Sequence, residues 1–198
     1  MVGKVAIGVK FRYSSVASGQ ISLQMPWGAS IGTSRFAVRT SDTGELVAGS
    51  IFNVATSSPA LFTMSGDGTG QGKILNQDGT QNSASKPAAR GSVIQILGTG
   101  QGPVSPPIAD GTAPSDATVS TVAVPTTDGQ ACLTQQSSVC VAIGSGFGDI
   151  QFSGLAPGMV GTWQIKMKVP AGIQPGNAVG LRAVINGVLS NIVTVAVK

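Results

Sequence analysis

The sequence predicts an all-β protein of the sandwich or barrel type. Apolar and polar residues alternate with a period of two in several segments, for example at Trp163, Ile165 and Met167. This alternation is typical of antiparallel strands with one face over a core. The 198 residues include 28 Gly and 11 Pro, which divide the chain into short segments. Only 10% of the residues are charged, whereas about 25% is usual in globular domains.

The expected strands follow one another along the whole chain. Each is bounded by Gly, Pro, Asn or Asp, the residues that favour turns. No segment between them shows the i, i+3, i+4 spacing of an amphipathic helix. In chain order the expected strands are 5–11, 21–25, 36–39, 51–55, 73–76, 92–97, 118–124, 139–143, 149–152, 163–169, 179–185 and 191–197.

An internal repeat organises these strands. The segment Val5-Ala6-Ile7-Gly8 is echoed by Val141-Ala142-Ile143-Gly144, and 20–26 is echoed at a similar distance by 164–170. Self-similarity of this kind indicates that one structural unit occurs twice.

Both copies continue in the same way. Each passes through a turn that contains a glycine, Gly32 or Gly176, into two further strands that end near Val54 and Val197. The second copy is preceded by a long segment without a counterpart before the first. We therefore expect the first unit to lack its opening strands.

Three parts of the chain follow from this comparison. We expect a partial sandwich at 1–57, a linker with a β-hairpin at 58–86, and a complete sandwich at 87–198. The partial sandwich would leave apolar surface in water, at a cost of about 25 cal/mol per Å², and would expose an unpaired strand edge. A neighbouring copy, an upstream part of a longer chain and the middle segment are the candidates to cover it.

The expected subunit interface consists of apolar residues from the partial sandwich and from the last strand. Strands 5–11 and 191–197 are the candidates to pass between chains, with the direction left open. The interface residues are Val5, Ile7, Val9, Phe11, Phe36, Ile51, Phe52, Val193, Val195 and Val197.

Cys132 and Cys140 are the only cysteines, and they lie in a segment rich in Ser and Gln. No other metal ligand is close to them in sequence. We expect a disulfide across a hairpin-like loop, which indicates an oxidising compartment. The alternative is two reduced, half-buried thiols.

The composition argues against catalysis and against several classes of partner. There is no His, so Ser/His and Cys/His catalysis and His-ligated zinc are excluded. Four of the acids, Asp67, Asp78, Asp110 and Asp128, precede Gly and are expected to start turns. The basic residues are scattered, and no apolar run is long enough to span a membrane. We expect no enzyme activity, no cofactor, no metal and no nucleic acid partner.

Aromatic residues provide an alternative function. Trp27 follows a proline at a strand end and, with Tyr13, is a candidate for an exposed contact with a glycan. Trp163 belongs to the apolar set of its strand, which favours core packing.

Several motifs together resemble a known family. Residues 11–27, 58–63, 75–80, 87–92, 98–103 and 154–158 are similar to the uncharacterised C-terminal module of many large secreted acidobacterial proteins. The segment 91–103 also resembles the opening strand of IPT/TIG domains. This resemblance implies tandem immunoglobulin-like sandwiches outside the cytoplasm, without an established activity. The chain departs from the pattern by starting midway through the first module and by carrying the segment with Cys132 and Cys140.

These observations predict a structural role. We expect a subunit of an extracellular fibre or cell-surface assembly, formed by strand complementation between identical chains. The alternative is a module that binds polysaccharide and anchors a larger secreted protein.

Overall fold

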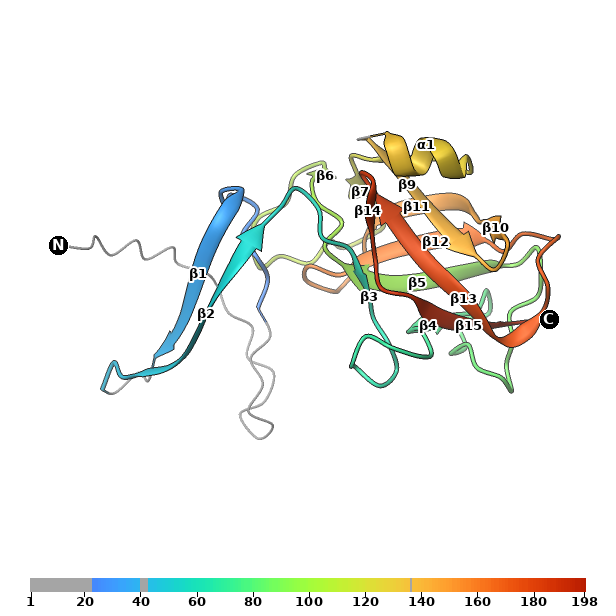
Figure 1. The fold of residues 1–198 in the computed structure, drawn as a ribbon, viewed down its shortest axis with the longest axis horizontal. Helices are drawn as coiled ribbons and strands as arrows, with labels where there is room; N and C mark the ends of the chain where they lie inside the picture. The colour runs from blue at the N-terminus through green and yellow to red at the C-terminus, as the bar shows by residue number, and fades with distance from the viewer. Residues whose placement is uncertain (1–22, 40–42, 136) are drawn as a thin grey trace.

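A computed structural model describes residues 23–39, 43–135 and 137–198 (Figure 1). The expected strand 5–11, the repeat segment at its start and Tyr13 lie outside the described residues. The strands are β1 (Gly32–Arg39), β2 (Leu46–Val54), β3 (Ala60–Leu61), β4 (Ile74–Leu75), β5 (Val93–Thr99), β6 (Val104–Ser105), β7 (Ser120–Thr121), β8 (Val124–Pro125), β9 (Ser138–Ile143), β10 (Gly146–Phe147), β11 (Asp149–Leu155), β12 (Trp163–Lys168), β13 (Gly176–Ile185), β14 (Val188–Leu189) and β15 (Val193–Val197). The described residues contain one short helix, α1 (Gly129–Thr134).

The structure confirms an all-β fold with two packed sheets, which are antiparallel except where β8 pairs with β9. One sheet has the order β3-β5-β12-β11-β7-β6, with β4 also on β5. The other contains β9, β13 and β15 side by side, with β10, β14 and β8 at its margins. The order β3-β5-β12-β11 opposite β9-β13-β15 is the A-B-E-D and C-F-G order of an immunoglobulin-like sandwich.

The core lies between these two sheets. Alternate residues of β5, β12, β9, β13 and β15 are buried in one hydrophobic cluster. Trp163 is fully buried there, and its Nε1 donates a hydrogen bond of 2.9 Å to Ser153 Oγ. The core position expected for Trp163 is therefore confirmed, since burial of an indole N–H requires a partner.

Residues 58–86 belong to the sandwich, so the linker expected there is wrong. Strand β3 pairs with β5, and β4 pairs with β5 through Ile74 and Ile96. Asn82 is fully buried, accepting from Ala196 N–H at 2.8 Å and donating to Ala196 O at 2.9 Å. The sandwich thus begins at β3. The pattern indicated a strand at 73–76, which contains β4, but β3 has only 2 residues and shows no alternation. The sequence therefore did not indicate that this segment joins the sandwich.

The helix α1 was not expected either. Asp128 caps it, because its carboxylate accepts from the N–H groups of Gln130 at 2.9 Å and Ala131 at 3.3 Å. A helix of 6 residues is less than two turns and cannot display a helical period. The Asp-Gly pair at 128 therefore starts a helix, while Gly68, Gly79 and Gly111 after the other three acids have the positive φ of turns.

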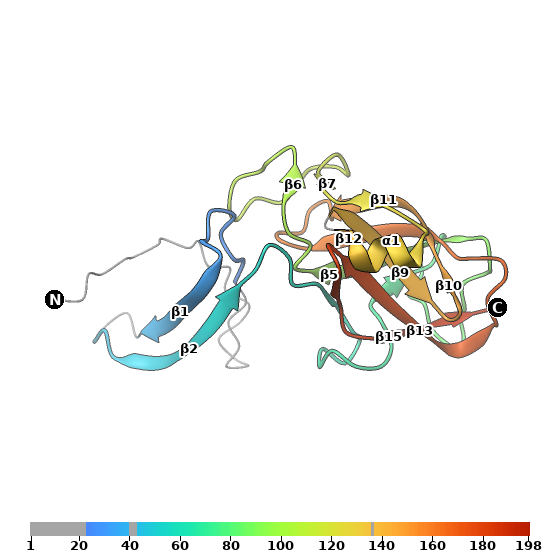
Figure 2. The same ribbon diagram turned by 45° about the horizontal axis from the view of Figure 1, so that its top comes forward.

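Strands β1 and β2 form a separate two-stranded antiparallel sheet, referred to here as the hairpin. Both ribbon views show it standing away from the sandwich and joined to it by the chain that follows β2 (Figures 1 and 2). The repeat is visible in the pairing: Gly32 lies opposite Val54, and Gly176 lies opposite Val197. The hairpin and the β13–β15 pair thus begin with the same glycine–valine pair, although a register shift follows Gly176 and none follows Gly32.

Candidate functional site

The hairpin has one apolar face. Its pairing places Phe36, Val38, Phe52 and Val54 on the same side, and the rings of Phe36 and Phe52 are 6.2 Å apart between centroids. Phe36 is 43% exposed, whereas an inward-facing aromatic of a sandwich is normally buried. We call these four residues the hairpin face.

Ile51 does not belong to the hairpin face. It is adjacent to Phe52 in β2, so its side chain points to the opposite side of the sheet. Ile51 is 61% exposed there. The grouping of Ile51 with Phe36 and Phe52 in one interface is therefore wrong.

Both long edges of the hairpin lack a third strand among the described residues. Strands β1 and β2 pair with each other from Gly32 opposite Val54 to Arg39 opposite Leu46, and no other described strand joins them. An open edge presents backbone N–H and C=O groups that can pair with another strand.

Strand β15 cannot serve as the strand that passes between chains. Val193, Val195 and Val197 are 0%, 0% and 3% exposed, and they pack in the core. One edge of β15 pairs with β13. The other edge is covered, because Thr194 bonds to Gly70 and Gly72 and because Ala88 bonds to Ala196 and Lys198. The expectation for 191–197 is therefore wrong; Val5, Ile7, Val9 and Phe11 lie outside the described residues.

The disulfide between Cys132 and Cys140 is present. It joins α1 to β9, rather than the two sides of a hairpin-like loop. Both cysteines are fully buried against Val184, with Phe147 packed beside them. The bond therefore holds the helix against the outer surface of the second sheet.

Acidic side chains are used to build turns. Asp67 Oδ1 accepts from Ser65 Oγ at 2.6 Å and from Thr69 N at 2.8 Å, and these bonds lower its pKa below the ordinary 3.8. Bonds from the Thr80 hydroxyl and N–H lower the pKa of Asp78 in the same way. In the described ranges, no three His, Cys, Asp or Glu side chains gather as metal ligands would.

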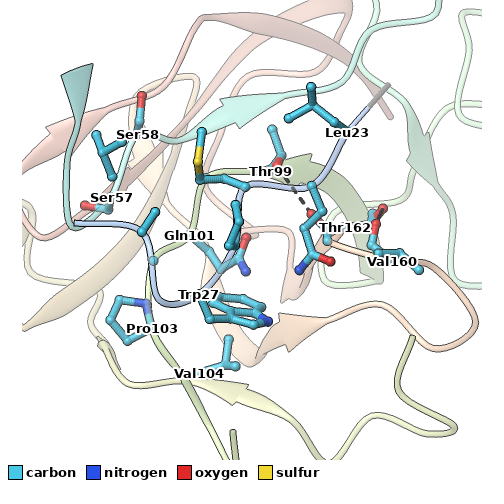
Figure 3. Close-up of a pocket in the computed structure, with 18 of the residues that line it drawn as sticks. Leu23, Trp27, Ser57, Ser58, Thr99, Gln101, Pro103, Val104, Val160 and Thr162 are labelled. Carbon is cyan, nitrogen blue, oxygen red and sulfur yellow. Dashed lines mark hydrogen bonds between the residues drawn. The ribbon is translucent and has the colours of Figure 1, made fainter. Parts of the chain in front are cut away.

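A groove lies where the segment 23–31 meets the end of the sandwich (Figure 3). Two hydrogen bonds of 2.8 Å attach this segment: Trp27 N–H donates to Asp110 Oδ1, and Gly111 N–H donates to Gln24 Oε1. The groove has a volume of about 1490 Å³ and is partly open to solvent.

Trp27 lines this groove and is half-buried. Its Nε1 is buried and has no hydrogen-bond partner. Trp27 also lies apart from any described strand, since residues 23–26 are not in regular structure.

Gln101 is a groove residue that the sequence pattern did not indicate. It is only 4% exposed and lines the groove. Neighbouring Gly100 and Gly102 lie so close to the backbone of Ser58 and Thr56 that a Cβ on either would collide with it. The glycines at 98, 100 and 102 therefore allow other backbone segments to pack closely against this stretch of chain. Gln101 lies between Gly100 and Gly102 and lines the groove.

No family model, curated protein or solved structure matches this chain. In the part of the chain that the structure describes, no helix has the length and hydropathy needed to cross a membrane.

Proposed function

We propose that this protein is a non-catalytic structural subunit of an extracellular or cell-surface assembly. In this proposal, a second copy of the chain completes the hairpin by adding strands to its open edge and apolar surface to its face. The observation that carries the proposal is the combination of an exposed Phe36, an apolar hairpin face and two strand edges without a third strand among the described residues.

The energetic argument is that a lone two-stranded sheet is marginal in water. The β13–β15 pair indicates what completes such a unit: β9 pairs with the other edge of β13, and the β12 sheet packs on its face. Among the candidates to cover the hairpin, the middle segment is already engaged, since β3 and β4 pair with β5. Of the two remaining candidates, a neighbouring copy and an upstream part of a longer chain, we propose the neighbouring copy.

The hairpin face also suits contact with an uncharged surface of a second copy. The other residues on this side of the hairpin are small and uncharged, and they include Ser34, Ala48 and Ser50. Arg35 points to the opposite side. Association of such a neutral face carries no penalty for burying a charge. Because the surface that gives strands differs from the surface that accepts them, the contact is heterologous and propagates as a filament.

The disulfide supports the proposed location outside the cytoplasm, since disulfides persist in oxidising compartments. The resemblance to the secreted acidobacterial module points in the same direction. Residues 5–11 of another copy remain the proposed strand donor.

Light scattering and electron microscopy of the full chain test this proposal. We expect the wild type to form oligomers or filaments at micromolar concentration, and Phe36→Asp to shift it to monomers, because the contact would then bury a carboxylate. Leu133→Asp is the matched control: Leu133 is 52% exposed on α1, away from the hairpin, and its replacement should leave assembly intact.

Two outcomes would contradict the proposal. One is a compact wild-type monomer over the same concentration range. The other is assembly that Phe36→Asp leaves unchanged, because the contact would then lie elsewhere on the molecule.

A further inference from the structure

The outer edge of β1 corresponds to an edge that is paired in the sandwich. Strand β1 pairs with β2 on one side, and no other described strand joins the hairpin (Figure 1). The strand that matches β1 in the repeat is β13, which pairs with β15 on one side and with β9 on the other. The outer edge of β15, which matches the outer edge of β2, is bonded instead by Gly70, Gly72 and Ala88. A counterpart of β9 would therefore lie on β1.

The sequence contains a counterpart of β9. Strand β9 ends in Val141-Ala142-Ile143, which begins the pattern Val-Ala-Ile-Gly-x-x-Phe at 141–147. The same pattern spans 5–11. In β9, Val141 and Ile143 are fully buried, and each lies opposite a residue of β13. Residues 5–11 lie outside the described residues, and β9 indicates where such a segment pairs.

The two strand pairs can be matched residue by residue through their partners. Leu181 of β13 and Phe36 of β1 each lie opposite a residue four positions before the valine that faces the first glycine of the pair. Leu181 therefore matches Phe36, once the extra residue that the register shift adds to β13 is counted. Since Ile143 lies opposite Leu181, its counterpart Ile7 belongs opposite Phe36.

This register brings apolar residues together. By the same match, Ala6 lies opposite Ala37 and Val5 lies opposite Val38. Directly opposite residues of an antiparallel pair share one face of the sheet, so Val5 and Ile7 extend the hairpin face and Ala6 lies on the other side. A shift of one residue would turn Val5 and Ile7 away from the hairpin face. The apolar pattern of the segment and the repeat therefore favour the same register.

We infer that residues 5–8 add to the outer edge of β1 as an antiparallel strand, with Ile7 opposite Phe36. In the proposed function, on which this assignment rests, the segment comes from a second copy of the chain. A third strand gives the hairpin the minimum of about three that an independently stable sheet needs, and the main-chain hydrogen bonds of the new pair supply affinity. Residues 5–8 carry no charge, so the contact buries none.

Engineered cysteines in the full chain test the edge and the register. Ala6→Cys with Ala37→Cys places both sulfurs on the side opposite to the hairpin face, at the Cα separation of about 4.4–6.8 Å that a disulfide spans. Ala6→Cys with Ile51→Cys is the matched control for the edge, because Ile51 is 61% exposed on the same side of β2. The two native cysteines are already joined and fully buried.

The crosslinks form in a glutathione redox buffer and are read by non-reducing electrophoresis, with mass spectrometry to identify the linked positions. We expect the link between positions 6 and 37 to exceed the link between positions 6 and 51 about tenfold or more, because cysteines with Cα atoms more than about 7 Å apart cannot be bridged without backbone movement. The 6–37 link should join separate chains into a ladder of covalent oligomers.

Substitutions on the two sides of the segment provide a second test without crosslinks. Ile7→Asp would bring a carboxylate onto the hairpin face, so it should raise the protein concentration needed for assembly about tenfold or more in light scattering. Ala6→Asp is the matched control, because its side chain would point away from that face, and it should change this concentration less than about twofold. Thermal unfolding of each variant checks that the sandwich is intact.

Three results would overturn the assignment. They are a 6–51 link as abundant as the 6–37 link, no link in either folded variant, and equal weakening of assembly by Ile7→Asp and Ala6→Asp. A 6–37 link within one chain, seen as a faster-migrating monomer, would support the edge and the register but contradict the assembly of identical copies. A 6–51 ladder would contradict the edge and leave the assembly proposal intact.

Discussion

The hairpin and the β13–β15 pair are both antiparallel strand pairs that begin with a glycine opposite a valine, but their environments differ. Each begins at a glycine opposite a valine, Gly32 with Val54 and Gly176 with Val197. In the sandwich, Val193 and Val195 are fully buried, whereas Phe36 in the hairpin is 43% exposed. The difference comes from neighbours: β9 pairs with β13, and residues 70–90 cover β15. The apolar face of such a strand pair must therefore be covered by other protein surface. Whether the same chain supplies this surface depends on its other segments.

The largest difference in stability between the two strand pairs is expected when a charged residue is placed on the apolar face of each. Val195→Asp buries a carboxylate in the core, so it should destabilise the sandwich by about 3 kcal/mol or more and prevent cooperative folding. Phe52→Asp, at the corresponding place in the hairpin, should leave the sandwich transition unchanged in a monomer. Thermal unfolding followed by Trp163 fluorescence measures both. A comparable loss in the two variants would contradict the comparison.

Removal of the disulfide should have the next largest effect and should act on the sandwich alone. Closing the loop between Cys132 and Cys140, which are 8 residues apart, is worth about 2–3 kcal/mol by chain-entropy reasoning. We expect the double substitution to Ala to lower the midpoint of chemical denaturation accordingly. Hydrogen exchange of the hairpin amides serves as the control, and these amides should exchange at the same rate with or without the bond.

Val197 and Val54 occupy matching positions in the two strand pairs, and their replacement by Ala should give a smaller difference in stability. Val197 is 3% exposed, so Val197→Ala should cost about 2 kcal/mol through lost burial and a residual cavity. Val54 is half-buried, and Val54→Ala should cost less than about 1 kcal/mol in a dilute monomer. If assembly covers the hairpin face, the Val54→Ala penalty should rise with protein concentration. Denaturation at two concentrations separates these cases, and a constant penalty would count against such cover.

The smallest effect concerns the segment that covers β15. The Asp67 and Asp78 carboxylates have pKa values lowered by the hydrogen bonds they accept from Ser65 and Thr80. Their stabilisation is therefore complete above the ordinary pKa of 3.8 and is lost as pH falls through the lower folded-state pKa. Both groups are exposed, so the change in melting temperature between about pH 5 and pH 3 should be small. A variant with Asn at both positions should show a smaller acid-induced decrease than wild type.

Much of the fold could be predicted because period-two alternation reports a half-buried strand directly. This pattern predicts the strand around Trp163 and the core position of that side chain. The pairing of Cys132 with Cys140 could also be predicted, because they are the only cysteines. The repeat also anticipated the equivalence of Gly32 and Gly176 at the start of paired strands. Of the candidate sites, the exposed Phe36 could be predicted, since a strand pair without its partner sheets leaves its apolar face uncovered.

Other features of the structure were not predicted from the sequence. Strand β3 has 2 residues, which is too few for a pattern, and the expected strand at 73–76 does not reveal that its partner is β5. The expected sandwich therefore begins too late in the chain. Ile51 was assigned to the face of Phe52 although adjacent strand residues point in opposite directions. The burial of Gln101 could not be predicted, because it depends on residues distant in the chain.

The amino-acid sequence alone determined the class of fold, the repeated strand pair, the disulfide partners and the lack of histidine chemistry, because these depend on residue type and local spacing. Only the tertiary structure decided that 58–86 completes the sandwich and covers the edge of β15, that Phe36 on the hairpin face is exposed, and that Trp27 and Gln101 line one groove. These features arise from contacts between residues far apart in the chain, and such contacts cannot be predicted from periodicity along the chain.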